Sequence, residues 1–163
     1  MSEGILKFKK LHPEAVIPQY QREGDAGFDF HALIVDHLDN MGNLGDTIIL
    51  IPGEQKIIRT GLSCFIPEGF EMQIRPRSGL AARRSITITN SPGTIDQNYI
   101  YPNEIQIILY NLGKLSFEIK NGDRIAQGKI AWVPKITIEE VEDIDEEDIK
   151  RNRGGGLGST GIK

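Results

Sequence analysis

The sequence predicts an all-β fold, arranged as a sandwich, jelly roll or barrel with little helix. Three observations lead to this prediction: the apolar segments are many and short, Gly and Pro turns separate them, and several alternate with a period of two. Phe70, Met72 and Ile74, for example, would share one face of a strand. With 163 residues, 39% hydrophobic and 26% charged, the chain is expected to form one soluble domain with its own core.

The first half of the chain contains most of the predicted strands. Residues 5–11 form a basic-apolar strand, and Pro13 and Pro18 interrupt the connection after it. Residues 25–32 run from a turn into an apolar strand, and the polar residues 36–46 form a surface loop. Four short strands follow at 47–51, 56–59, 62–66 and 70–75, divided by Pro-Gly, Thr-Gly and Pro-Glu-Gly turns.

The second half begins with the one short helix that we expect, a single turn at residues 80–84. Strands are predicted at 85–89, 104–110, 115–119 and 124–132, with turns at 111–113 and 121–122. After Pro134 the chain becomes acidic at 139–148 and glycine-rich at 154–161. Such a tail cannot bury enough apolar surface to order itself, so it is either a frayed terminus or a mobile lid over a site.

Charge and cysteine content narrow the classes of function. A formal charge of −4 and a pI near 5.4 argue against binding to a nucleic-acid backbone, which needs clustered cations. No apolar run has membrane-spanning length, and the N-terminus lacks a signal-peptide pattern. The lone Cys64 lies in an apolar run and is expected to be a small buried hydrophobe. We therefore expect a cytoplasmic protein.

Residues 75–104 bring together an anion-binding turn, an alternating strand and a carboxylate. Arg77, Ser78 and Gly79 open a helical turn with a cation, a hydroxyl and free backbone N–H groups, which suits a phosphate. As an isolated tripeptide these residues fit an ordinary turn equally well. Their position close in sequence to the alternating strand and the carboxylate favours a phosphate and nucleoside site.

In the second part of this stretch, three residues each have both a functional and a structural interpretation. The amide of Asn90 could read the edge of a pyrimidine, or initiate a turn. Asp96, next to Ile95, could be a general base for water, or a surface turn residue. Tyr99 could pack on a sugar ring or belong to the core.

Two other segments could contribute to such a site. Asp25 and Asp29 flank Gly27 and could hold a hydrated divalent cation, although a turn with Asp-backbone bonds explains them as well. His31 has no histidine partner at metal-site spacing and is expected to be a strand residue. The glycines of the tail, mixed with Arg153, could wrap phosphates with backbone N–H groups.

Five ordered segments resemble the five motifs of the trimeric dUTP pyrophosphatase (dUTPase) family, and together they cover nearly the whole chain. They are Ala26-Gly27-Phe28-Asp29-Phe30, Pro76-Arg77-Ser78-Gly79-Leu80-Ala81, Asn90 with Pro92-Gly93-Thr94-Ile95-Asp96 and Tyr99, Gly122-Asp123-Arg124-Ile125-Ala126-Gln127, and Arg153 with Gly158-Ser159-Thr160-Gly161.

This resemblance implies a jelly-roll-like dUTPase β-barrel or sandwich that assembles as a homotrimer. The second and fourth motifs of one chain, the third of a neighbour and the tail of the remaining chain would form each active site. Residues 1–138 would be the β domain, and residues 139–163 an acidic connector and glycine-rich arm that closes a neighbouring site. The implied reaction is hydrolysis of dUTP to dUMP and pyrophosphate with Mg²⁺.

The resemblance also implies a role for each matched residue. Asp96 would orient and deprotonate the attacking water, Asp29 would hold the hydrated Mg²⁺, and Tyr99 would pack on the deoxyribose. The remaining residues implied to contact substrate are Arg77, Ser78, Gly79 and Gln127 at the phosphates, Asn90, Gly93, Thr94, Ile95 and Gln106 at uracil and sugar, and Arg153, Leu157, Ser159 and Thr160 in the arm.

The chain departs from the family pattern at three points. The segment after Tyr99 is two residues longer than usual, which changes the hairpin near Gln106. Asn98 stands where an Asp is usual. Leu157 replaces the usual aromatic residue, which allows it to cover the base only as an apolar lid.

Two other functions are alternatives to dUTP hydrolysis. A dCTP deaminase of the same fold would need a catalytic Glu on the strand after the third motif, where Ile108 stands. A nucleotide-dependent regulatory binding protein belongs to a different class, and Asp96, Ser78 and the tail argue against a loss of catalysis. Residues 36–46 are a candidate surface for an additional protein partner.

Overall fold

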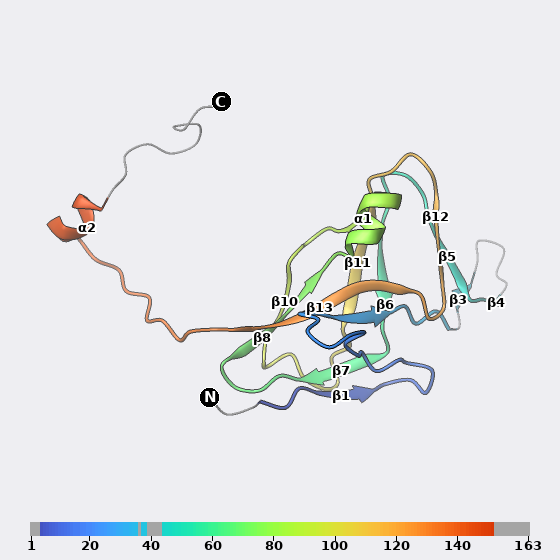
Figure 1. The fold of residues 1–163 in the computed structure, drawn as a ribbon, viewed down its shortest axis with the longest axis horizontal. Coiled ribbons are helices and arrows are strands. Elements are labelled where there is room, and N and C mark those ends of the chain that lie inside the picture. Colours follow the sequence, from blue (N-terminus) through green and yellow to red (C-terminus); the bar gives the residue numbers. More distant parts are fainter. Residues whose placement is uncertain (1–3, 36, 39–43, 152–163) are drawn as a thin grey trace.

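The computed structural model describes residues 4–35, 37–38 and 44–151. Within them the chain is mostly β (Figure 1). The strands are β1 (Lys7–Lys10), β2 (Phe28–His31), β3 (His37–Leu38), β4 (Leu44–Gly45), β5 (Thr47–Leu50), β6 (Gln55–Arg59), β7 (Leu62–Phe65), β8 (Phe70–Arg75), β9 (Ile86–Ile88), β10 (Gly93–Ile95), β11 (Gln106–Asn111), β12 (Phe117–Lys120) and β13 (Arg124–Trp132), and the helices are α1 (Ser78–Arg84) and α2 (Glu146–Lys150).

A four-stranded antiparallel sheet in the order β10-β8-β13-β2 is the centre of the fold. A second sheet has the order β6-β11-β9, and the pairs β1-β7, β5-β12 and β3-β4 complete the strands. Within the described residues these sheets form a sandwich-like body rather than one closed barrel. The predicted all-β class is confirmed.

The core lies between the sheets because strands alternate apolar and polar residues. Met72 and Ile74 of β8 are buried, as the period-two pattern predicts. On β2, Phe28 and Phe30 are buried, and they pack edge-to-face with the ring of Phe8. The polar residues that alternate with them along β2, Asp29 and His31, consequently face the opposite side of the sheet.

Gly128 of β13 is required by this aromatic packing. A Cβ built on Gly128 would lie 2.8 Å from the ring of Phe30 and closer still to that of Phe28. β13 therefore approaches β2 closely enough that a side chain at this position would displace an aromatic ring. The close approach brings Asp29 opposite Gln127 on the other face of the sheet.

Four predicted elements differ from those observed. Helix α1 begins at Ser78, two residues earlier than expected. Residues 93–95, where no strand was predicted, form strand β10, because they pair with β8. Both ends of the expected loop at 36–46 pair as β3 and β4. The acidic segment contains the additional helix α2, whose first turn holds Glu146, Glu147 and Asp148, favourable at a helix N-terminus.

After β13 the chain leaves the body as a long extended segment that leads to α2 (Figure 1). The last contacts with the body are Val133 N donating to Gly69 O at 2.8 Å and an exposed Lys135–Glu68 ion pair. Beyond them Ile136, Ile138 and other apolar side chains are exposed. No helix among the described residues is long and apolar enough to cross a membrane.

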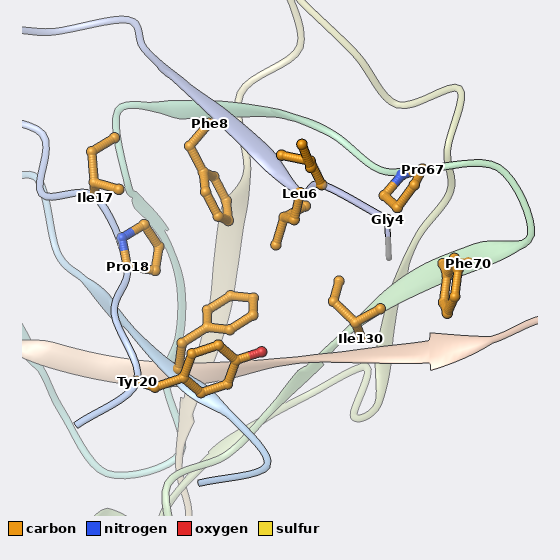
Figure 2. A pocket seen from close by; sticks show the side chains of 11 residues that line it. Gly4, Leu6, Phe8, Ile17, Pro18, Tyr20, Pro67, Phe70 and Ile130 are labelled. Atoms are coloured by element: carbon orange, nitrogen blue, oxygen red, sulfur yellow. The ribbon is translucent and has the colours of Figure 1, made fainter. Parts of the chain in front are cut away.

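An apolar groove of about 690 Å³ lies beside β1. Figure 2 shows Leu6 and Phe8 on one side of it, with Tyr20 and Ile130 facing them from the other. In the described part of the chain, strand β1 pairs with β7 alone, and its exposed residues include Lys7 and Lys9. The groove therefore adjoins an edge strand that carries positive charge.

Candidate active site

Arg77 lies where β8 ends and α1 begins, and Asp29 of β2 holds its side chain. The Nε of Arg77 donates to Oδ1 of Asp29 at 3.0 Å, and its Nη1 donates to the backbone oxygen of Arg124 at 2.9 Å. The Asp29 side chain is only 14% exposed. A charged hydrogen bond between partly buried groups fixes the guanidinium next to Ser78 and Gly79 at the start of α1.

Arg124 makes the second contact with the same carboxylate. Its Nη1 donates to Oδ2 of Asp29 at 3.2 Å. The register of β13 against β2 shifts between Arg124 and Ala126, so Arg124 lies opposite His31 while Gln127 lies opposite Asp29. Because Asp29 and His31 share a face of β2, this bulge places Arg124 and Gln127 on one face as well.

Gln127 connects β13 to the turn before the helix. Its Nε2 donates to the backbone oxygen of Pro76 at 2.8 Å. A Cβ built on Gly27 would lie 3.1 Å from the Gln127 Oε1 atom, so the absence of a side chain at Gly27 makes room for this amide. The first, second and fourth motif segments therefore meet at one place.

His31 lies in strand β2 beside these charges, as expected of a strand residue. Burial lowers the pKa of its imidazole, since it disfavours the charged form; the Asp29 carboxylate opposes this effect, and the Arg124 and Arg77 charges add to it. Its Nδ1 is buried without a hydrogen-bond partner among the described residues. The lowered pKa favours a neutral imidazole here, which avoids a third cation beside the two arginines.

A second group of predicted residues lies on β10 and the hairpin after it. A Cβ on Gly93 would lie 3.1 Å from the Asn90 Nδ2 atom, so the Asn90 amide lies over the start of β10. β10 is an edge strand, because within the described residues it pairs only with β8. Backbone groups of Thr94 and Ile95 on its outer side can therefore bond to a ligand.

Asp96 follows β10 and is exposed in the single chain. Its neighbour in sequence, Ile95, is apolar. The shallow hollow of about 280 Å³ that Asp96 lines does include Phe70 and Val133, but also the charged Glu71 and Lys135. The carboxylate is thus accessible to water at the surface of one chain.

The longer hairpin after Tyr99 is held by several bonds. The Tyr99 hydroxyl donates to the Glu104 backbone oxygen at 2.8 Å, and the ring is 37% exposed. The Glu104 carboxylate accepts from the Gly61 N–H at 2.7 Å and pairs with Arg59. These bonds orient Tyr99 although the segment after it is two residues longer than usual. Gln106 is exposed at the start of β11.

Asp96 and the Arg77 cluster lie toward opposite ends of β8. β10 runs antiparallel to β8 with Ile95 opposite Met72, so Asp96 lies near the start of β8, whereas Ser78 follows its end. The six residues of β8 span roughly 20 Å at about 3.3 Å per residue. One chain therefore does not bring Asp96 to the Arg77 cluster.

The Asp29 carboxylate fits a metal ion whose other ligands are the phosphates of a bound molecule and water. No group of three or more His, Cys, Asp or Glu side chains that could hold a metal occurs in the described part of the chain. Both Asp29 oxygens accept from arginine, but a carboxylate has about four acceptor sites and can also accept from metal-bound water. Mg²⁺ typically binds through one or two carboxylates together with phosphates and water.

Most of the residues predicted to contact phosphate or metal lie together. The structure brings Asp29, Arg77 and Gln127 together, and it groups Asn90 with Gly93. It adds Arg124, which had no predicted role, because the bulge that turns it toward Asp29 has no local sequence signal. The arm residues Arg153, Leu157, Ser159 and Thr160 lie outside the described residues.

Comparison with known proteins identifies relatives of the whole chain. The dUTPase family model matches residues 13–161. A deoxyuridine 5'-triphosphate nucleotidohydrolase of Nautilia profundicola is 46% identical over 157 residues, covering 96% of this chain and 98% of that protein. A protein of the same name from Picosynechococcus is 45% identical, with the same coverage.

Solved structures agree with the sequence relatives. A dUTPase mutant of Staphylococcus bacteriophage 80alpha with dUpNHpp has a TM-score of 0.73 at 25% identity, covering 96% of this chain and 99% of that one. A dUTPase mutant from phage phi11 of S. aureus, solved with a structural Mg(II) ion, has a TM-score of 0.70 at 23% identity, covers 85% and 97%, and supports the fold alone. From its family match and its curated relatives, this chain belongs to the dUTPase family.

Proposed function

We propose that this chain hydrolyses dUTP to dUMP and pyrophosphate in an Mg²⁺-dependent reaction, which keeps uracil out of DNA and supplies dUMP for thymidylate synthesis. The observation that carries the proposal is the Arg77–Ser78–Gly79 turn, held by Asp29 and Gln127 at the start of α1. A fixed guanidinium beside free helical N–H groups is suited to a polyphosphate. The family relationship supports the choice of dUTP.

The phosphates would bind at this turn. Arg77 supplies charge, Ser78 a hydroxyl and Gly79 a backbone N–H, and Gln127 keeps the turn in place through Pro76. Asp29 would also accept from water on Mg²⁺, and the bound ion would offset the negative charge of the triphosphate. In this arrangement the protein contributes position and charge neutralisation.

The nucleoside would bind along β10. The Asn90 amide and the outer backbone of Gly93, Thr94 and Ile95 can read the polar edge of uracil. Tyr99, held by its bond to Glu104, would pack on the deoxyribose and crowd out a 2′-hydroxyl. Gln106, exposed at the start of β11, would complete the sugar side.

Asp96 would act as the general base. Its carboxylate takes a proton from a water molecule as that water forms a bond to the α-phosphorus. The bond from this phosphorus to the bridging oxygen breaks, and pyrophosphate leaves with the electron pair. Removal of the proton by a positioned carboxylate typically contributes about 10²–10⁴-fold to the rate.

A homotrimer would complete each active site. The span of β8 separates Asp96 from Ser78 in one chain, so the third motif segment of a neighbour must supply the base to the phosphate turn. Asn90, Thr94 and Asp96 are exposed in the single chain and are accessible to such a neighbour. The two groups of one chain would then serve two different sites.

The arm, residues 139–163, would reach a neighbouring chain, while residues 1–138 form the body. Two features support an arm that extends to a neighbour: the chain leaves the body after Lys135, where Ile136 and Ile138 are exposed (Figure 1), and an apolar groove lies beside the basic strand β1 (Figure 2). Arg153, Ser159 and Thr160 would clamp the terminal phosphates, with Leu157 as an apolar lid over the base.

Pyrophosphate release should be assayed side by side with dUTP, dCTP, dTTP and UTP, with Mg²⁺ and with EDTA. The proposal expects Mg²⁺-dependent turnover of dUTP and little from the other three nucleotides. Ammonia release from dCTP, or no turnover of dUTP with Mg²⁺, would contradict it.

A further inference from the structure

We propose that Arg124 is a second phosphate-binding cation of the nucleotide site, in addition to Arg77. The proposal rests on the proposed function, because it adds a residue to the same site. It concerns a side chain that the motif resemblance left without a role, at the start of β13.

The geometry shows one carboxylate shared by two guanidinium groups. Oδ1 of Asp29 accepts from Arg77 at 3.0 Å, and Oδ2 accepts from Arg124 at 3.2 Å. One negative charge therefore faces two positive charges, and the cluster keeps a net positive charge. Two arginines held this close repel each other, and a bound anion would relieve that repulsion.

Both arginines retain access to solvent. The Arg124 side chain is 45% exposed and that of Arg77 is 26% exposed, whereas Asp29 beneath them is 14% exposed. A guanidinium has five N–H donors, and the contact with Asp29 engages one nitrogen of Arg124. No other acceptor of Arg124 occurs among the described residues, so its remaining donors can bind an anion that lies over the cluster.

The backbone around Arg124 is shaped to place it there. In a regular strand Arg124 and Gln127 would face opposite sides, because their separation is odd. The bulge between Arg124 and Ala126 brings both to the side of Asp29. The Arg124 backbone oxygen also accepts from Arg77, so the two residues are coupled through main chain and side chain.

A purely structural ion pair with Asp29 is the competing explanation. Partly exposed ion pairs contribute little to stability, and Asp29 already has Arg77 as a partner. Neutralising Arg124 should therefore change stability little. If Arg124 binds phosphate, neutralising it should reduce affinity in proportion to the charge of the phosphate chain.

The test compares dUMP with a nonhydrolysable dUTP analogue, by calorimetry on the full chain with Mg²⁺. In Arg124→Gln we expect analogue affinity to fall about tenfold or more, as for loss of a charged hydrogen bond, and dUMP affinity to fall much less. Arg124→Lys should recover part of the loss. Arg84→Gln, at the exposed end of α1, removes the same charge and should leave both affinities unchanged.

The outcomes separate this proposal from the proposed function. If wild-type protein binds the analogue well and Arg124→Gln binds both ligands like wild type, the role of Arg124 is wrong and the function stands. Equal losses for dUMP and the analogue also overturn it, because they indicate a general disturbance. If the wild-type chain binds neither ligand, both proposals fail.

Discussion

Gln127 donates from Nε2 to the backbone oxygen of Pro76 at 2.8 Å, across 51 residues of sequence. The bond attaches the middle of β13 to the turn that leads into Arg77 and the first helical N–H groups. It is therefore a direct connection between the fourth and second motif segments. The turn at Arg77, Ser78 and Gly79 therefore depends on the sheet for its position.

Replacing Gln127 with Leu should misplace this turn. We expect kcat/KM for dUTP to fall about tenfold or more and the free energy of unfolding to fall by about 1 kcal/mol, since one partly buried hydrogen bond is lost. Steady-state kinetics and urea unfolding measure the two effects. Gln55→Leu at the exposed start of β6 is the matched control. Wild-type kcat/KM in Gln127→Leu would show that the bond does not position the turn.

Replacing Asp96 with Asn should separate catalysis from binding. The amide cannot take the proton from water, so we expect kcat to fall by about 10²–10⁴-fold. Binding of a nonhydrolysable dUTP analogue, measured by calorimetry, should stay close to wild type, because Asn has nearly the size of Asp and the proposed role of Asp96 is to act on the attacking water rather than to hold the nucleotide. Asp46→Asn, on another exposed turn, controls for the loss of a surface charge. An unchanged kcat would mean that another group is the base.

Replacing Gly128 with Ala should destabilise the sheet beneath the site. The new methyl group would meet the rings of Phe28 and Phe30, and such overpacking typically costs about 1–3 kcal/mol. Gly45→Ala places its methyl group in open space and is the matched control. Thermal or urea unfolding of the two variants provides the comparison. Equal stability of both would show that the rings move aside freely.

The strands could be predicted from sequence to the extent that their signal is local. Residues 124–132 and 70–75 have the predicted bounds as β13 and β8, because alternation and flanking turns mark them. β10 was not expected as a strand, since its three residues are ordered by pairing with β8 and not by their own pattern. The helix α2 was also missed, because an acidic, exposed segment gives little packing signal.

The site shows the same division between local and long-range information. Motif resemblance named Asp29, Arg77 and Gln127, and the structure places them together. The motif resemblance could not show that both Asp29 oxygens accept from arginine, because this contact depends on the bulge in β13 and on pairing across 95 residues. The role of the tail is a prediction that concerns residues outside those described.

Cys64 should be unreactive in the folded protein. Its side chain is fully buried, and burial raises the pKa of its thiol from 9.0 to about 11. At pH 8 about one thiol in a thousand would be ionised at such a pKa, and the thiolate is the reactive form. We expect a disulfide reagent to label Cys64 only after denaturation. Rapid labelling of native protein at pH 8 would contradict its burial.

The raised Cys64 pKa also gives stability a dependence on alkaline pH. The folded state holds its proton more tightly than the unfolded state, so this contribution is complete below pH 9.0 and is lost as the pH rises toward 11. Cys64→Ala removes the titrating group. The variant should lose less stability than wild type between pH 8 and pH 10 in urea unfolding. The same loss in both proteins would assign the alkaline dependence to other groups.

Ending the chain at Asn152 should separate assembly from closure of the site. Among the described residues, the last hydrogen bond and ion pair between this end of the chain and the body are at Val133 and Lys135, so we expect the body to fold without residues 153–163. We expect a trimer by light scattering, with kcat/KM for dUTP lower on the order of a hundredfold, because the clamp on the terminal phosphates is lost. Removing only residues 162–163 retains the fifth motif segment and should leave kcat/KM unchanged. A truncated chain that failed to assemble would show that residues 153–163 stabilise the trimer, and full activity would show that they do not close the site.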